Sequence, residues 1–357
     1  MSPPATPHGS RPRIAPVGAI IWLCLGLASC EALASCTTPN AAGPAIGAAA
    51  SQAILTPSLA PTATRSLELA GTPFFPEKDF QYGPAGLAAV LGASGVTATP
   101  DQLTALVYLP AQHGSPPLEV QAAPGRFERM AYQLAPDLAA VLAELDAQRP
   151  VLVLQDVGSV ASPKPHYAVL IGYDAQTDTV LLRSGTTRRQ VVPARDFLAA
   201  WDNASRWAML VLRPGELPVI ASRKRYLAAA AEFERGARPE DALLAFNAAL
   251  KVWPDEPLAW IGHGTAQLHA GDLVAAARDY STALRIDGSN IAGRNDLART
   301  LLDLGCIRKA QSQIDKISFS GLSEAQQAII FATRDQVTAR SNNLLAMEPP
   351  ACGEFSY

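Results

Sequence analysis

The sequence predicts an α+β domain followed by an all-α region built from helical repeats. Predicted helices precede antiparallel strands between residues 66 and 217, only helices follow, and one residue pattern recurs every 34 positions. The chain has 357 residues, of which 48% are hydrophobic and 17% charged, so it can form two hydrophobic cores. A formal net charge of −3 without a basic cluster argues against a nucleic-acid partner.

The first 29 residues have the pattern of a secretion signal. Two arginines precede an apolar run from Ile14 to Ser29, which is short for a membrane span. The run ends in Leu-Ala-Ser-Cys30, which resembles the bacterial lipobox, where the cysteine carries the lipid. The same four residues end at Cys36, but Cys30 is favoured because it follows the apolar run directly; an uncleaved membrane anchor is the alternative. These features predict a lipid anchor in the bacterial cell envelope, facing the periplasm, with the outer membrane favoured over the inner.

Residues 30–65 are predicted to form a linker, and the cysteine positions indicate which covalent and metal sites the chain can form. The segment is rich in Ala, Pro, Thr and Ser and almost uncharged, which is typical of a flexible linker. Because the chain contains no Cys-x-x-Cys spacing, neither a metal site nor a cofactor is predicted. An exported protein can form disulfides, and Cys306 with Cys352 is one possible pair.

Between residues 66 and 217 three predicted helices come first and the predicted strands follow. Hydrophobic periodicity, proline positions and turn residues place each of them. Helices are predicted at 82–95, 99–109 and 136–150, strands at 151–157, 166–174, 179–184 and 207–215, and a strand with a short helix within 189–201.

Several blocks of this domain resemble the C39 branch of the papain-like cysteine peptidases, and its lipoprotein-type members in particular. The helix that opens Tyr82-Gly-Pro-Ala is similar to the family's Cys-Gly-Pro-Ala start, and a strand begins His166-Tyr-Ala-Val and ends Gly-Tyr-Asp174. The blocks GTPFFPEKDF, VYLPAQHGS and LLRSGTTRR add to the likeness in the same order. The resemblance implies a papain-like α+β fold.

The resemblance also implies four catalytic parts: a cysteine thiolate, a histidine base, a residue that orients the histidine, and an upstream glutamine that helps hold the oxyanion. Tyr82 stands at the nucleophile position, and a phenol is bulkier and less nucleophilic than a thiolate. His166 matches the base. The glutamine position falls at Pro76–Glu77, and the orienting position falls at Arg183–Ser184, with Asp174 the nearest carboxylate.

The replaced thiol predicts that hydrolysis by this mechanism is absent. Tyr82 is either a cleft residue or core filler, His166 either a remnant of the site or a structural histidine, and Asp174 either a remnant or a turn residue. C39-like domains of type I secretion exporters that lack the cysteine are associated with binding unfolded substrate, so the resemblance implies a polypeptide partner. The alternative is an active C39-family peptidase, similar to bacteriocin-processing endopeptidases, that uses an unrecognised nucleophile.

The second region carries a repeat. Small and aromatic residues recur at 34-residue intervals: Ala242, Phe246 and Ala249, then Ala276, Tyr280 and Ala283, then Ala310, Ile314 and Ile317. This period resembles that of tetratricopeptide repeats and implies a solenoid over 220–322 that binds peptides or protein partners. A capping helix is expected at 323–341, followed by a loose tail at 342–357.

Overall fold

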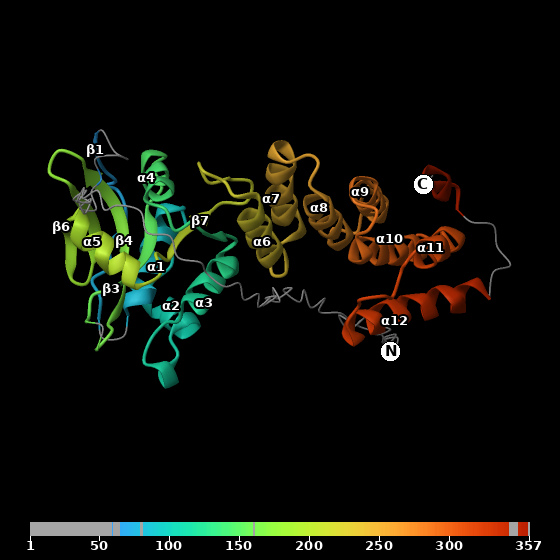
Figure 1. Cartoon of the computed structure of the whole chain (residues 1–357), viewed down its shortest axis with the longest axis horizontal. Coiled ribbons are helices and arrows are strands. Elements are labelled where there is room, and N and C mark those ends of the chain that lie inside the picture. Colours follow the sequence, from blue (N-terminus) through green and yellow to red (C-terminus); the bar gives the residue numbers. More distant parts are fainter. Residues whose placement is uncertain (1–58, 60–64, 79–80, 160, 343–348, 356–357) are drawn as a thin grey trace, which may run out of the picture. The chain divides into compact units, whose positions relative to one another are not determined.

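The computed structural model describes residues 59, 65–78, 81–159, 161–342 and 349–355. The predicted signal segment, Cys30, Cys36 and nearly all of the linker therefore lie outside the described residues. The elements, labelled in Figure 1, are β1 (Ser66–Glu68), α1 (Tyr82–Ala93), α2 (Pro100–Val107), η1 (Pro110–Gln112), α3 (Pro117–Ala122), η2 (Ala123–Phe127), β2 (Met130–Gln133), α4 (Leu138–Asp146), β3 (Val151–Asp156), β4 (Pro165–Asp174), β5 (Thr179–Ser184), β6 (Thr187–Pro193), α5 (Ala194–Asn203), β7 (Ala208–Leu212), α6 (Arg223–Glu234), α7 (Pro239–Val252), α8 (Pro257–His269), α9 (Leu273–Ile286), α10 (Ile291–Asp303), α11 (Ile307–Ile314), α12 (Glu324–Ser341) and η3 (Pro350–Glu354).

The strands of the described chain form one seven-stranded antiparallel sheet. Its order is β2-β7-β3-β4-β5-β6, and β1 pairs with the end of β4. Gln155 of β3 stands opposite His166 of β4, and Leu182 of β5 stands opposite Leu170 of β4. Residues opposite each other share a face, so His166, Gln155 and Leu182 lie on one face of the sheet. Helices before and after antiparallel strands confirm the predicted α+β class.

Two helices cover opposite faces of the sheet. On α1, a Cβ at Gly86 would lie 2.7 Å from Leu152 Cδ1 and 3.7 Å from Val169 Cγ2, so this helix packs closely on the face away from His166. On the other face, α5 packs against β3 through the buried side chains of Phe197 and Trp201. Pro84 lies in the first turn of α1, as predicted, and Gly95, with φ +88°, follows the helix end.

The segment before α1 is fixed to the sheet by a buried arginine. Arg183 on β5 is 5% exposed, and its guanidinium donates to the carbonyl oxygens of Ala70 (3.0 Å) and Thr72 (3.1 Å). Further upstream, Leu59 is fully buried and its N–H donates to Asp178 at 2.8 Å. The prediction of a linker without fixed contacts is therefore wrong at Leu59, because an apolar side chain there finds a place in the core.

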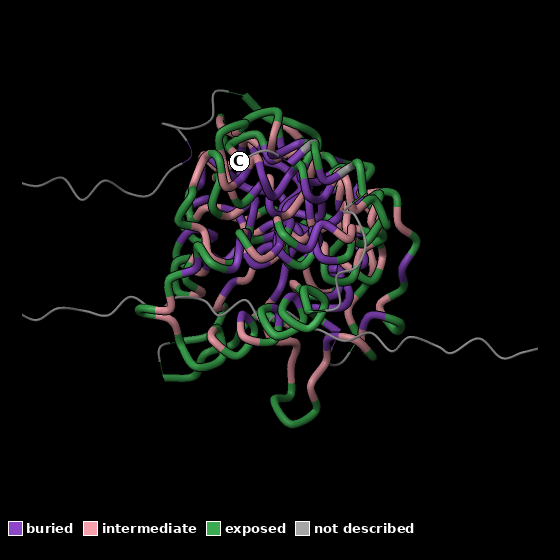
Figure 2. The backbone as a smooth tube through the Cα atoms, turned by 90° about the vertical axis from the view of Figure 1, so that its right-hand side faces the viewer, coloured by how far each residue is buried: buried purple, intermediate pink, exposed green. Residues whose placement is uncertain are grey.

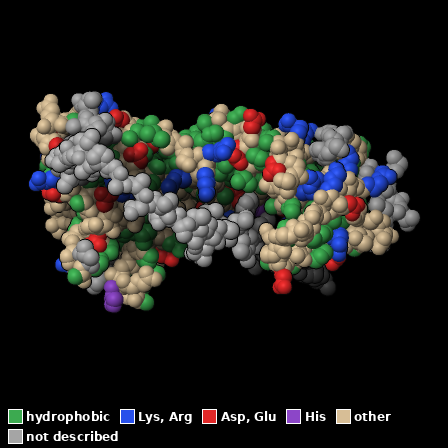
Figure 3. All heavy atoms as spheres, in the orientation of Figure 1, with side chains coloured by type: hydrophobic (Ala, Val, Ile, Leu, Met, Phe, Trp, Pro, Cys, Tyr) green, Lys and Arg blue, Asp and Glu red, His purple; other side chains and the backbone are tan. Residues whose placement is uncertain are grey.

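The buried residues form two hydrophobic clusters, one that runs from the sheet to the first turn of α8 and one among the later helices. Figure 2 shows the buried backbone (purple) inside a layer of exposed segments (green). On the face that Figure 3 shows, acidic and basic side chains are mixed. In the described part of the chain, no helix has the length and hydropathy that crossing a membrane requires.

After β7 the described residues contain helices only. Each predicted 34-residue unit holds two of them, α6 with α7, α8 with α9, and α10 with α11. Between α7 and α8, the Phe246 ring of α7 lies so close to the α8 backbone that a Cβ at Gly262 would overlap it. The helix expected at 323–341 is α12, which begins at a Ser323–Gln326 capping box.

The C-terminal segment departs from the sequence prediction. Cys306 and Cys352 form a disulfide with a Cα–Cα distance of 5.4 Å. Phe355 is 2% exposed, and the Lys309 ammonium donates to its carbonyl oxygen. The expectation of a loose tail is therefore wrong for residues 349–355, because the covalent bond and an apolar side chain hold them against α11.

Candidate functional site

Tyr82 and His166 meet, although 84 positions separate them in the chain. Tyr82 is the first residue of α1, and His166 is the second residue of β4. Their ring centroids are 5.3 Å apart, with an edge-on interplanar angle of 61°. Because Tyr82 is 45% exposed, it is not a core residue. The phenol thus stands beside the imidazole at the start of the helix, as the sequence pattern expects of a nucleophile.

Two further side chains approach the same ring nitrogen. Ser184 Oγ, at the end of β5, lies 2.8 Å from His166 Nε2, which is hydrogen-bond distance. Glu77 Oε1 lies 3.8 Å from this Nε2, and the Glu77 side chain is only 7% exposed. We name Glu77, Tyr82, His166 and Ser184 the imidazole cluster.

Burial favours the uncharged forms of both titratable partners. Loss of solvent raises the pKa of Glu77 to about 7, against a smaller opposing effect of a backbone hydrogen bond with Gly185. The same loss of solvent lowers the pKa of His166. Glu77 Oε2 is buried and has no hydrogen-bond partner among the described residues. Burial therefore favours a neutral imidazole over imidazolium, next to a carboxyl that keeps its proton up to about pH 7.

The backbone explains why Glu77 reaches the ring. Its N–H donates to the carbonyl oxygen of Gly185 at 3.1 Å, in the tight turn between β5 and β6. Gly185 has φ +60°, a conformation that glycine adopts without strain. Since Ser184 directly precedes this turn, one contact positions both polar side chains beside His166.

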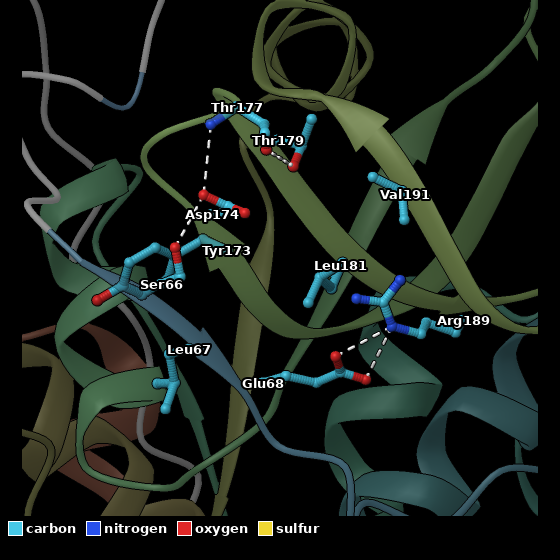
Figure 4. Close-up of a pocket in the computed structure, with 10 residues that line it drawn as sticks. All are labelled: Ser66, Leu67, Glu68, Tyr173, Asp174, Thr177, Thr179, Leu181, Arg189 and Val191. Carbon is cyan, nitrogen blue, oxygen red and sulfur yellow. Dashed lines mark hydrogen bonds and ion pairs between the residues drawn. The ribbon is translucent and has the colours of Figure 1, made fainter.

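Asp174 lies outside the imidazole cluster. It is eight residues beyond His166 on β4, a distance of about 26 Å along a strand. Its carboxylate accepts from the Ser66 hydroxyl at 2.8 Å and from the N–H groups of Gln176 and Thr177. Figure 4 shows this arrangement at one side of a pocket, with the Glu68–Arg189 ion pair at the other. Asp174 is therefore placed as a turn residue, and Ser184 occupies the position beside the imidazole.

Gln81, next to the nucleophile position, is also engaged elsewhere. It is 8% exposed, and its amide Nε2 donates to Asp101 Oδ1 at 2.6 Å. The resemblance placed the glutamine position at Pro76–Glu77 and the orienting position at Arg183–Ser184, but it did not predict that Glu77 and Ser184 would face the same nitrogen. Glu77 is indicated by its place five positions before Tyr82. Ser184 is indicated by its place at the end of the strand that follows the His166 strand.

The arrangement lacks the order of a catalytic triad. In such a triad the nucleophile and the carboxylate contact different ring nitrogens, so that the histidine accepts a proton on one side and is stabilised on the other. Here Ser184 and Glu77 both face Nε2, and Nδ1 has no hydrogen-bond partner within the described chain. The two cysteines that the structure describes are joined in a disulfide, so no free thiol is available among the described residues.

Part of the chain is similar to a known protein family. Residues 82–209 match the model of the Peptidase_C39 like family, from Tyr82 to the second residue of β7. This part of the chain has a C39-like fold. No curated protein matches the chain.

Several solved structures also resemble parts of this chain, at low sequence identity. A protein from Bacillus anthracis described as a C39-like peptidase has 18% identity and a TM-score of 0.35, and the match covers 42% of this chain and 98% of that one. The peptidase domain of Streptococcus ComA, described as a bi-functional ABC transporter in quorum sensing, has 17% identity and a TM-score of 0.31, with 42% and 98% covered. The Sgt2 TPR domain from Aspergillus fumigatus has 17% identity and a TM-score of 0.30, with 36% and 85% covered.

Proposed function

We propose that the C39-like domain binds polypeptide without cutting it. The observation that carries this proposal is the Tyr82 ring, 5.3 Å from the His166 ring, at the helix start where the family's mechanism needs a thiolate. Glu77 at the glutamine position and Ser184 at the orienting position support it, because neither supplies what the mechanism requires there. Residues that grip an extended chain differ from those that cleave it, so binding can outlast the loss of cleavage.

The C-terminal helices are proposed to add a second interaction surface. Their pairing within each 34-residue unit, and the close approach of α7 and α8 at Gly262, support a tetratricopeptide-type solenoid. Such a solenoid holds a peptide segment or a partner domain. The protein would then scaffold a complex or hold a polypeptide through both regions.

The proposed location is the bacterial cell envelope. The lipobox-like sequence at Cys30 supports a lipid anchor facing the periplasm, with the outer membrane favoured. The Cys306–Cys352 disulfide agrees with an oxidising compartment. Membrane association would come from the anchor.

A photo-crosslinking experiment tests the binding proposal. The full chain, purified in detergent, carries benzoylphenylalanine in place of Tyr82 and is irradiated with a library of unstructured peptides. We expect adducts with intact peptides, identified by mass spectrometry. The matched control carries the same group at Leu118, which is 74% exposed and belongs to α3. Labelling at position 82 no stronger than at position 118 would contradict the proposal.

One observation favours an alternative, an active peptidase with Ser184 as nucleophile. Its Oγ lies 2.8 Å from His166 Nε2, which is the serine–base distance of a hydrolase. Against this, Glu77, the one carboxylate within 4.0 Å of a His166 ring nitrogen among the described residues, faces the same nitrogen. A fluorophosphonate probe that labels the wild type but not a Ser184→Ala variant would establish the alternative.

A further inference from the structure

A cavity of about 430 Å³ borders the imidazole cluster on the α5 face of the sheet. Its walls come from the ends of β3 and β4, from β5 and β6, and from α5. The lining residues are Gln155, Asp156, Val157, Gly158, His166, Leu182, Ser184, Gln190, Val192, Asp196, Ala199, Ala200 and Asn203. We name this space the α5 cavity. Its volume lies within the range of ordinary ligand pockets, and Tyr82 is not part of its lining.

The charged groups of the α5 cavity have one sign. Asp156 and Asp196 are carboxylates, and none of the described lining residues is a lysine or arginine. His166, the remaining titratable group, has a pKa that burial lowers, so it adds little positive charge near neutral pH. The cavity therefore disfavours an anion and favours a cation.

A buried amide points to an occupant. Gln155 is 5% exposed, lines the cavity, and its side-chain amide has no hydrogen-bond partner within the described chain. The amide can therefore hydrogen-bond a group that enters the cavity. Since Gln155 stands opposite His166 in the sheet register, the amide lies on the wall next to the imidazole cluster.

Asp156 is held in place before any ligand arrives. Its Oδ1 accepts from the N–H of Gly158 at 2.9 Å and from the N–H of Lys164 at 2.7 Å. These bonds fix one oxygen, and the carboxylate keeps its second oxygen for another donor. At the rim, Asp196 in the first turn of α5 is exposed and pairs with Arg195 at 3.3 Å. The inner carboxylate is thus the better-ordered acceptor of the two.

The remaining wall suits an aliphatic stem. Leu182 and Val192 on the strands face Ala199 and Ala200 on α5, and all four side chains are apolar. Arginine and lysine bury their methylene groups against such surfaces while their charged ends reach polar groups. A guanidinium also donates in several directions at once, which matches a carboxylate and an amide oxygen in one cavity.

From these observations we infer that the α5 cavity receives an arginine or lysine side chain of a bound polypeptide. The inference rests on the proposed function and adds a residue preference to it. The cationic end lies in the part of the cavity that Gln155 and Asp156 line, and the stem lies against the apolar wall. A peptide held there passes beside the imidazole cluster, since His166 and Ser184 line the same cavity.

Fluorescence anisotropy with the full chain in detergent tests the inference. The probes are labelled octapeptides of Gly, Ala and Ser in which each position in turn carries Arg, Lys, norleucine or Glu. We expect Arg or Lys at one position to bind at least tenfold more tightly than norleucine at that position. Norleucine keeps the apolar stem without the charge, so this ratio isolates the cationic end.

Three variants locate the effect. Asp156→Asn keeps an acceptor for the Gly158 and Lys164 N–H groups and removes only the charge, so the preference should fall below threefold. Gln155→Leu should weaken the Arg peptide more than the norleucine peptide. The matched control is Asp137→Asn, which changes a carboxylate that caps α4 outside the cavity and should keep the full preference.

The outcomes separate the two proposals. Equal binding of Arg, Lys and norleucine peptides would overturn the cavity inference and leave the proposed function standing. A preference for Arg or Lys that survives Asp156→Asn would also overturn the cavity inference. If Asp156→Asn folds poorly, Asp196→Asn replaces it in the assay, because Asp196 is an exposed residue at the rim of the cavity. Loss of the preference in Asp196→Asn would support an acidic cavity. Failure of every peptide to bind would contradict the proposed function and the inference together.

Discussion

Burial shifts the pKa values of His166 and its neighbour Glu77 in opposite directions. It raises the pKa of the Glu77 carboxyl to about 7 and lowers the pKa of the imidazole, so it favours the uncharged form of each group. A cysteine peptidase instead stabilises a thiolate–imidazolium pair. The polarity of the imidazole cluster is therefore poorly suited to cysteine-peptidase chemistry, whichever residue stands at position 82.

Glu77→Gln should remove a pH dependence of stability. The Glu77 pKa is about 7 in the folded protein and near 4.5 otherwise, so the folded state keeps the proton longer and the wild type loses stability as the pH rises from about 4.5 to 7. The stability advantage of the variant should grow by about 2 kcal/mol between pH 5 and pH 8. Urea unfolding of both proteins at the two pH values measures this difference in the free energy of unfolding. Because both proteins contain His166, the contribution of its titration largely cancels in the difference. An advantage that stays constant with pH would contradict the assignment.

Tyr82→Cys should place a thiol beside the imidazole without restoring cleavage. We expect iodoacetamide to label the introduced thiol, since a helix start and a nearby histidine favour the thiolate. Peptide hydrolysis should stay absent until Ser184→Asp and Glu77→Gln are added. Peptide mapping locates the label, and a second protein that also carries His166→Ala serves as control. An unlabelled thiol, or cleavage by the single variant, would show that the cluster is arranged differently.

Sequence reasoning reached part of this site. A Gly-Pro pair predicted that a helix starts near Tyr82, and the resemblance to C39 peptidases implied that His166 stands at the base position. It could not predict which way Glu77 and Ser184 face. That depends on the bond from the Glu77 N–H to the Gly185 carbonyl oxygen, which joins two segments far apart in the chain.

Among the elements, long periodic segments were predicted correctly and short ones were missed. The helix at 82–95 and the strands at 166–174 and 179–184 appear as α1, β4 and β5. The short strands β1 (Ser66–Glu68) and β2 (Met130–Gln133) were not predicted. Strands of three or four residues carry no periodicity, and partners distant in the chain, β4 and β7, complete their hydrogen bonding.

Gly262→Ala should destabilise the helical region. Alanine normally favours a helix over glycine by roughly 0.5–1 kcal/mol, yet here its Cβ would overlap the Phe246 ring between α8 and α7. We expect a net loss of about 1–3 kcal/mol in the free energy of unfolding. Gly236→Ala is the control, because nothing lies within 4 Å of its Cβ position. Equal stability of the two variants in thermal unfolding would mean that α7 and α8 do not cross closely.

On the scale of the whole molecule, one covalent bond ties the C-terminus to the helices. The Cys306–Cys352 disulfide spans 46 positions, for which chain entropy gives a stabilisation of about 4 kcal/mol. Sequence composition left this pairing open, since two cysteines permit a bond without requiring one. The same bond explains why the tail is fixed where a loose end was expected.

Reduction should therefore lower the thermal stability of the C-terminal helices. We expect a phosphine reductant to decrease the melting temperature of these helices, as measured by circular dichroism at 222 nm. A Cys306→Ala/Cys352→Ala variant should start at the lower temperature and not respond to the reductant. An unchanged melting temperature on reduction of the wild type would contradict a stabilising disulfide.

The central claim is that a C39-like domain with Tyr82 at the nucleophile position binds polypeptide and does not cleave it. The most direct measurement is mass spectrometry of a diverse peptide library after long incubation with the full chain, with the His166→Ala variant in parallel. The account predicts that both proteins leave every peptide intact. New peptide termini produced by the wild type and absent with His166→Ala would contradict it.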